Sequence, residues 1–153
     1  MKNFTRKKTI LLAVTFGFVL AVQITAAAPP PPLLPNPILV FVGQEEKVIN
    51  GQTVMRYNFD VFNKKEYPAD FFAAAPNLPP CGTNTKAART WVDFYDQNGK
   101  RLNGFCALGS TSDLGKIYFS LDSTKLPPSW VYIELNDRQT STKYKSNLAE
   151  TTL

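Results

Sequence analysis

The chain has only two cysteines, Cys81 and Cys106, whose thiols could form a reactive pair, part of a metal site or a disulfide. They lie far apart in the sequence, so they do not form the C-x-x-C motif of thioredoxin-like redox sites. A zinc site takes four nitrogen or sulfur ligands, and the chain contains no histidine. An even cysteine count is typical of a disulfide in an exported protein. The sequence therefore favours a Cys81–Cys106 disulfide, with free thiols and a metal site as the alternatives.

The lack of histidine also limits catalysis. It excludes Ser-His-Asp and Cys-His machinery and nearly all catalytic zinc sites. Carboxylates remain, and Asp113, Asp122 and Asp137 lie in expected loops that can meet at one end of a fold and hold calcium. No D-x-D-x-D spacing supports that arrangement, which favours separate surface acids. We expect no catalytic residue, no metal and no cofactor.

The elements that position these residues follow a period of two from Ile38 onward. The segment 53–63 is the clearest strand: Met55, Tyr57, Phe59 and Val61 share one face, and polar residues occupy the other. The residues before it, Asn50 to Gln52, are a turn signal. Further strands are expected at 38–49, 116–121, 130–135 and 142–146.

A hairpin is expected between Trp91 and Cys106, because Asn98-Gly99 favours a two-residue type I′ turn. This register places three pairs of residues opposite each other: Trp91 and Cys106, Tyr95 and Leu102, and Asp96 and Arg101. The last pair is a candidate cross-strand ion pair.

A long connection precedes this hairpin, and its prolines exclude a central strand. A short helical turn is expected at 69–75, packed through Phe71 and Phe72 over an open end of the core. A connection of this length is either a cover or a functional loop.

Short strands separated by regular turn signals, with no long helix, predict an all-β fold. We expect a single antiparallel β-sandwich of about seven strands, with a small closed barrel as the alternative. The sandwich is expected over 38–147, followed by a flexible tail over 148–153.

The segment "LPPSWVYIEL" resembles the tyrosine corner of fibronectin type III domains. Leu126, Pro128 and Tyr132 stand at its L-x-P-x-x-x-Y spacing. The resemblance implies an immunoglobulin-like sandwich, in which the tyrosine hydroxyl bonds the backbone of the preceding connection. The strand departs from that family in phase, since Glu134 and Asn136 occupy positions that are apolar there. The chain also resembles small secreted bacterial proteins of unassigned function, which implies no residue roles.

The first 27 residues have the pattern of a signal peptide. Basic residues at positions 2 and 6–8 precede an apolar run, 9–22, that is too short to span a bilayer. Small residues follow, and cleavage is expected after Ala26 or Ala27; an uncleaved anchor is the alternative. The expected location is periplasmic or extracellular. The Pro-rich segment 28–37 is expected to be a stiff spacer rather than a polyproline ligand.

The formal net charge of +5 arises mostly from this N-terminal segment, so the remainder is nearly neutral. Nucleic-acid binding needs a basic patch on the folded domain, and it is therefore not expected. No stable membrane insertion is expected after cleavage of the signal peptide.

Both faces of the expected hairpin are apolar enough to require burial. Either the connection 67–80 covers one of them, which we favour, or an aromatic patch remains exposed for a partner. The candidate binding residues are Phe71, Phe72, Trp91, Tyr95, Trp130 and Tyr132.

The sequence thus predicts an exported, non-catalytic binding or accessory module that uses an aromatic patch or a sheet edge. The expected partner is an unidentified protein or glycan in the envelope or outside the cell. The alternatives are a small carboxylate-based hydrolase or lyase, and an inhibitor or envelope structural protein presenting the 68–80 loop.

Overall fold

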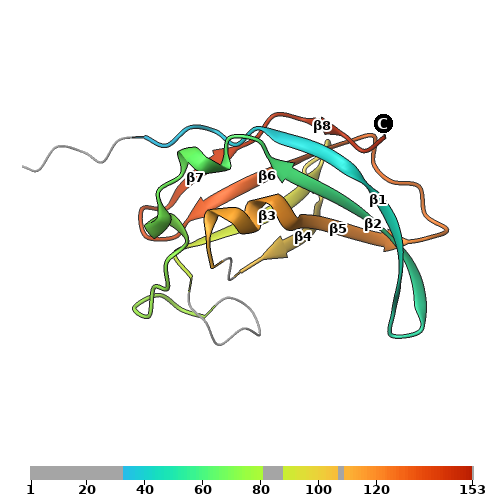
Figure 1. Ribbon diagram of the computed structural model, residues 1–153, viewed down its shortest axis with the longest axis horizontal. Coiled ribbons are helices and arrows are strands. Elements are labelled where there is room, and N and C mark those ends of the chain that lie inside the picture. Colours follow the sequence, from blue (N-terminus) through green and yellow to red (C-terminus); the bar gives the residue numbers. More distant parts are fainter. Residues whose placement is uncertain (1–32, 81–87, 107–108, 153) are drawn as a thin grey trace, which may run out of the picture. The chain divides into compact units, whose positions relative to one another are not determined.

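The computed structural model describes residues 33–80, 88–106 and 109–152, and it confirms the all-β prediction. One antiparallel sheet has the strand order β1-β2-β5, and the other has the order β4-β3-β6-β7, with β8 also pairing with β6 (Figure 1). The bounds are β1 Leu39–Ile49, β2 Gln52–Val61, β3 Thr90–Asp96, β4 Arg101–Phe105, β5 Ile117–Asp122, β6 Trp130–Asp137, β7 Thr142–Lys145 and β8 Ala149–Glu150. In this part of the chain, no helix is both long and apolar enough to cross a membrane.

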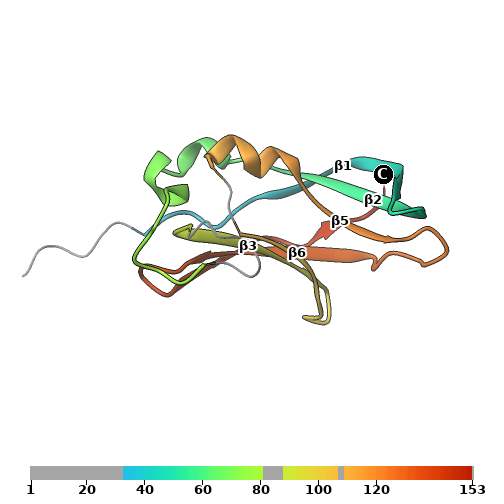
Figure 2. The ribbon, with the colours of Figure 1, turned by 90° about the horizontal axis from the view of Figure 1, so that it is seen from below.

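The core lies between the two sheets, which form separate layers in the edge-on view of Figure 2. Phe94 of β3 contacts Phe59 of β2 and Phe119 of β5, with ring centroids 5.3 and 5.9 Å apart. Alternation along the strands produces this core: Tyr57, Phe59 and Val61 are buried, as predicted from their shared face.

Asparagine side chains join the two sheets at both edges. On one edge, Asn103 Nδ2 of β4 donates to the Tyr118 carbonyl of β5 at 2.8 Å. On the other, the Asn147 amide holds Leu39 of β1: its Oδ1 accepts from the Leu39 N–H at 2.8 Å, and its Nδ2 donates to the Leu39 carbonyl at 3.1 Å. The Asn147 side chain therefore makes the two backbone hydrogen bonds with Leu39 that a neighbouring strand would otherwise make.

We predict that Asn147→Ala lowers the free energy of unfolding by about 1–3 kcal/mol, because Leu39 is 2% exposed and both of its backbone groups lose their partner. Urea unfolding measures this loss, and hydrogen exchange at the Leu39 amide should accelerate. Asn77→Ala, at an exposed position, is the control. Equal stabilities of the two variants would contradict the role of the Asn147 amide.

Two Asn-Gly dipeptides form different turns. Asn50 and Gly51 both have positive φ, 50° and 78°, which is the two-residue turn expected for this dipeptide. In the β3–β4 hairpin only Gly99 has positive φ, and the Asp96 carboxylate accepts the N–H groups of Asn98 and Lys100 at 2.8 and 2.9 Å. This side chain stabilises a longer turn with a bulge, so the predicted type I′ turn at Asn98-Gly99 is wrong.

The bulge changes the hairpin register beyond Phe94. Val92↔Phe105, Asp93↔Gly104 and Phe94↔Asn103 follow the predicted register. Tyr95, however, lies opposite Arg101 instead of Leu102. Arg101 consequently pairs with Asp93 at 2.7 Å, and the predicted Asp96–Arg101 ion pair is wrong. A second bulge lies in β1, between Phe41 and Gly43.

Three short 3₁₀ helices cover one end of the core: η1 Lys64–Glu66, η2 Ala69–Phe72 and η3 Thr111–Lys116. The helical turn expected at 69–75 is confirmed for 69–72, with Phe71 0% and Phe72 2% exposed. Ser110 and Asp113 cap η3 reciprocally, which satisfies the donors at its start.

The folded region extends beyond both expected boundaries. Ala149 and Thr151 are buried, and the Thr151 Oγ1 donates to the Pro128 carbonyl at 2.6 Å, so the prediction of a flexible tail over 148–153 is wrong for 149–151. The end of the expected spacer is also part of the fold: the Pro35 carbonyl accepts from the Tyr67 hydroxyl at 2.9 Å, and Pro37 is buried.

Candidate functional site

Two of the six predicted binding residues lie in the core. Phe71 and Phe72 are 0% and 2% exposed, and Phe71 packs against Tyr67 and Tyr144 with ring centroids 5.4 and 5.9 Å apart. Burial leaves neither ring available to a partner, so their prediction as binding residues is wrong.

The other four residues lie on a single surface, the outer face of the β4-β3-β6-β7 sheet. Trp91 and Tyr95 of β3 alternate with the buried Val92 and Phe94. Trp130 and Tyr132 of β6 point to the same outer face, while Val131 and Ile133 between and after them point into the core. Trp130 is exposed there, whereas Tyr132 is only 8% exposed. We call Trp91, Tyr95, Trp130 and Tyr132 the aromatic strip.

The aromatic strip is partly exposed and partly covered by cations. Tyr95 lies opposite Tyr132, and their rings stack at 5.2 Å with an interplanar angle of 19°. Lys145 Nζ lies 4.0 Å from the centroid of Tyr132, and the Arg138 guanidinium lies 4.9 Å from that of Trp91. These cation–π contacts stabilise the rings where they meet water. Trp130 is 40% exposed.

An acidic pair lies in the middle of the strip, because Asp93 and Glu134 are directly opposite across β3 and β6. Like charges in this position repel each other. Asp93 is bonded to Arg101 at 2.7 Å and to the Asn136 amide at 3.0 Å, and Glu134 pairs with Lys143 at 3.4 Å. Burial raises the pKa of Tyr95, and the charges of Asp93 and Glu134 raise it further. The Tyr95 hydroxyl is therefore a neutral donor at physiological pH.

The aromatic side chains of the 67–80 connection do not provide the expected cover for this face. Tyr67, Phe71 and Phe72 all belong to the core. The covering groups are Lys145 of β7 and Arg138. The Nη1 of Arg138 donates to the Ala88 carbonyl at 3.0 Å, and its Nη2 donates to the carbonyl of Pro79, in the connection, at 2.5 Å. The strip thus keeps an exposed portion around Trp130.

Tyr132 does not form a tyrosine corner. Val131, Ile133 and Leu135 fill the core, so Tyr132 points to the outer face, with its hydroxyl close to Gly99 of the β3–β4 hairpin. Within the described ranges, no hydrogen bond joins that hydroxyl to the connection before β6. In the tyrosine corner the tyrosine shares its face with apolar residues, whereas here Tyr132 shares its face with Glu134 and Asn136. This difference places Tyr132 outside the core.

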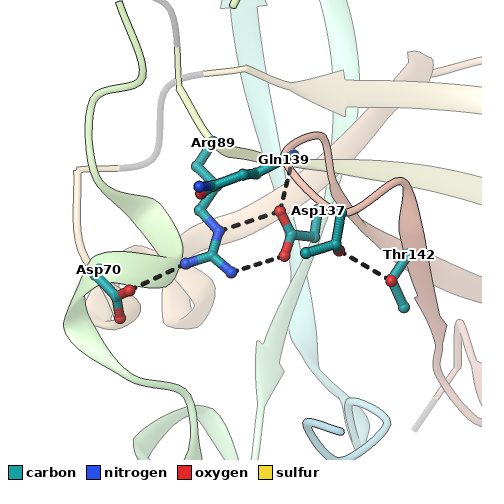
Figure 3. A network of polar contacts seen from close by, with 6 residues as sticks. Asp70, Arg89, Asp137, Gln139 and Thr142 are labelled. Carbon is teal, nitrogen blue, oxygen red and sulfur yellow. Dashed lines mark hydrogen bonds and ion pairs between the residues drawn. The ribbon is translucent and has the colours of Figure 1, made fainter. Parts of the chain in front are cut away.

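A buried ion pair anchors the long connection to the end of β6 (Figure 3). Arg89 Nε and Nη2 donate to the two Asp137 oxygens at 3.1 and 2.8 Å, and Nη1 donates to Asp70 of η2 at 3.0 Å. Burial alone would raise the pKa of Asp137, but the bonds from Arg89 and from the Gln139 N–H outweigh it and lower that pKa. The carboxylate is therefore ionised and serves as a structural group.

The remaining loop acids have separate local partners. Asp113 caps η3, and Asp122 accepts from the N–H and hydroxyl of Thr124 at 2.9 and 2.6 Å. These bonds lower the pKa of Asp122. Within the part of the chain that the structure describes, no three His, Cys, Asp or Glu residues are grouped to hold a metal.

Sequence reasoning did not identify the Arg89–Asp137 pair. Arg89 precedes β3 by one residue and Asp137 ends β6, and their association depends on the pairing of Thr90 with Asp137. No spacing in the sequence reveals that pairing. Cys106 follows β4 and is half-buried, whereas Cys81 lies outside the described residues, so the disulfide stays a prediction.

No protein-family model matches this chain, and no curated protein and no solved structure matches it significantly.

Proposed function

We propose that this protein is an exported, non-catalytic binding module that recognises a protein or glycan through the aromatic strip. The observation that supports the proposal is that four aromatic residues of β3 and β6 share an outer face, where an antiparallel sheet normally exposes polar residues; three of them are at least partly exposed, and Tyr132 is buried beside them. Trp and Tyr are enriched in recognition surfaces because they combine a large apolar area with a polar group.

The strand order supports an immunoglobulin-like class. Immunoglobulin constant domains place strands A, B, E and D in one sheet and C, F and G in the other. Here β1, β2 and β5 form one sheet, and β3, β6 and β7 belong to the other. The fourth strand differs, since β4 pairs with β3 instead of joining the first sheet. Many extracellular recognition domains use this architecture.

A non-catalytic role is supported by the absence of histidine and by the separate structural partners of the loop acids. Export is supported by the order of basic, apolar and small residues over 1–27. Presentation of the 68–80 loop to a partner is less favoured, because its largest side chains, Phe71 and Phe72, are buried.

The experiment is retention of envelope components and arrayed glycans by the immobilised protein, followed by titration of the retained molecule. We expect Trp130→Ala and Tyr95→Ala to weaken binding by about tenfold or more, as for central residues of an interface. Phe62→Ala is the matched control, because Phe62 is 75% exposed and follows β2 of the other sheet. Undiminished binding by both strip variants, with the fold intact, would refute the proposal.

A further inference from the structure

The outer face of the other sheet, β1-β2-β5, contains a cavity of about 460 Å³ beside the end of η3. Strands β1, β2 and β5 contribute its walls together with η3, and the residues used below are Val42, Glu45, Arg56, Asn58, Lys116 and Tyr118. This volume lies in the range of small-molecule sites. The cavity and the aromatic strip belong to different sheets.

Two cations of this cavity have no carboxylate partner. Within the described residues, neither Arg56 nor Lys116 forms an ion pair. Glu45 lies opposite Arg56 across β1 and β2, but its carboxylate is bonded to Lys47 at 2.8 Å and to the Asn58 amide at 3.3 Å. Their positive charges therefore favour an anion in the cavity.

The next acid on this face of β2 is also engaged. Asp60 lies two residues beyond Asn58, and both of its oxygens accept from Lys64 Nζ at 2.6 Å. The local acids thus have ion-pair partners of their own. The hydrogen bond from Lys47 lowers the pKa of Glu45, and the charge of Arg56 contributes to this lowering at a distance. Neither Arg56 nor Lys116, however, is in an ion pair within the described residues.

Arg56 also has unused hydrogen-bonding capacity. Its guanidinium lies 4.0 Å from the centroid of Tyr118, which fixes its plane, and its buried Nε has no hydrogen-bond partner among the described residues. Ser120 lies directly opposite Arg56 across β2 and β5, and its buried hydroxyl also has no hydrogen-bond partner among the described residues. Buried polar atoms without a partner are uncommon and often indicate a missing ligand or water. Of these two residues only Arg56 lines the cavity, so its unpaired donor is the one that a ligand in the cavity can satisfy.

We propose that this cavity binds a compact acidic ligand of monosaccharide size, with a carboxylate or sulfate group held by Arg56 and Lys116. A guanidinium bonds planar oxyanions through a fork of N–H donors, and both Arg56 and Lys116 line the cavity. The exposed side chain of Val42, 59% accessible, and the Tyr118 ring provide the wall for the body of the ligand. The Asn58 amide and the Tyr118 hydroxyl supply further polar contacts.

The test is a titration of the ¹⁵N-labelled protein, followed by amide chemical shifts, with glucuronate, glucose 6-sulfate and glucose as probes. Glucuronate and glucose 6-sulfate distinguish binding of a carboxylate from binding of a sulfate. Glucose, which has the same sugar ring without an acidic group, is the neutral control. We expect saturable shifts at 42–45, 56–58 and 115–118 with one or both acids and none with glucose. No shift with either acid at tens of millimolar, or equal shifts with glucose, would overturn the proposal.

Variants test the roles of the two cations. Arg56→Gln and Lys116→Gln are each expected to weaken binding of the acidic probe about tenfold or more, the size of a charge-assisted hydrogen bond. Lys125→Gln removes an exposed lysine of the β5–β6 connection and is expected to leave binding unchanged. Equal weakening by all three variants would show that the net charge of the protein attracts the acidic probe, and it would overturn the proposed site. Because the aromatic strip is unaltered in these variants, their outcome does not bear on the proposed function.

Discussion

Replacing Arg89 with methionine is expected to lower the free energy of unfolding by about 3 kcal/mol or more at neutral pH. The Asp137 side chain is 1% exposed, and Arg89 is its only ion-pair partner among the described residues. Methionine preserves much of the side-chain volume and leaves a buried carboxylate without its cation. Chemical denaturation monitored by tryptophan fluorescence measures the loss.

The same variant should show a characteristic pH dependence. In the folded wild type the pKa of Asp137 is lowered, so its ion pair contributes stability above the ordinary carboxyl pKa of 3.8, and this contribution is lost as the pH falls through the lowered value. In Arg89→Met, burial is no longer opposed by the guanidinium, and the pKa of Asp137 rises. The stability difference between the two proteins should therefore be largest at neutral pH and narrow as the solution is acidified.

Arg101→Met is the matched control for this prediction. It removes an arginine from another Asp–Arg pair, but Arg101 is 58% exposed and Asp93 keeps its bond to Asn136. The expected loss is below about 1 kcal/mol, as for exposed ion pairs. Equal losses in the two variants, or an Arg89→Met deficit that does not change with pH, would contradict the structural role of the buried pair.

Replacing Phe71 with alanine is expected to lower the free energy of unfolding by about 3–5 kcal/mol. The ring is fully buried in η2 and contacts Tyr67, Phe72 and Tyr144, so its removal leaves a cavity at the end of the core. Urea unfolding measures the loss. This result would establish that a residue selected from the sequence as a binding candidate acts through packing.

Phe62→Ala makes the same chemical change at a position that is 75% exposed. Its expected effect is within about 0.5 kcal/mol, as for surface positions. A Phe71→Ala protein as stable as Phe62→Ala would contradict the core assignment. Under conditions where Phe71→Ala remains folded, it should retain ligand binding, whereas Trp130→Ala should not.

The strands could be predicted because their residues alternate strictly. Tyr57, Phe59 and Val61 on β2 and Ile117 and Phe119 on β5 place every second side chain in the core. This local pattern depends on backbone geometry alone. The helical turn of η2 was also predictable, since adjacent prolines exclude a strand and two phenylalanines require burial.

Features that depend on a competing side chain or on distant pairing could not be predicted. Asp96 converts the Asn98-Gly99 turn into a longer one by accepting two backbone N–H groups, and the dipeptide alone favours the shorter turn. Aromatic type also does not distinguish a core ring from a surface ring: Phe71 is buried and Trp130 is exposed because of where their segments pack. Predicting the cavity at Arg56 would have required knowledge of how the three strands β1, β2 and β5 pair.

The construction of β1 has a consequence for self-association. β1 is an edge strand with exposed Val40 and Val42, and such a strand is a template for pairing between copies and for aggregation. Three features oppose this: Asn147 occupies the backbone groups of Leu39, the bulge after Phe41 breaks the flat edge, and charged residues occupy 45–47. Natural sheets use bulges, charges and covering groups to protect their edges. The asparagine that closes the sandwich thus also keeps one copy of the chain from extending the sheet of another.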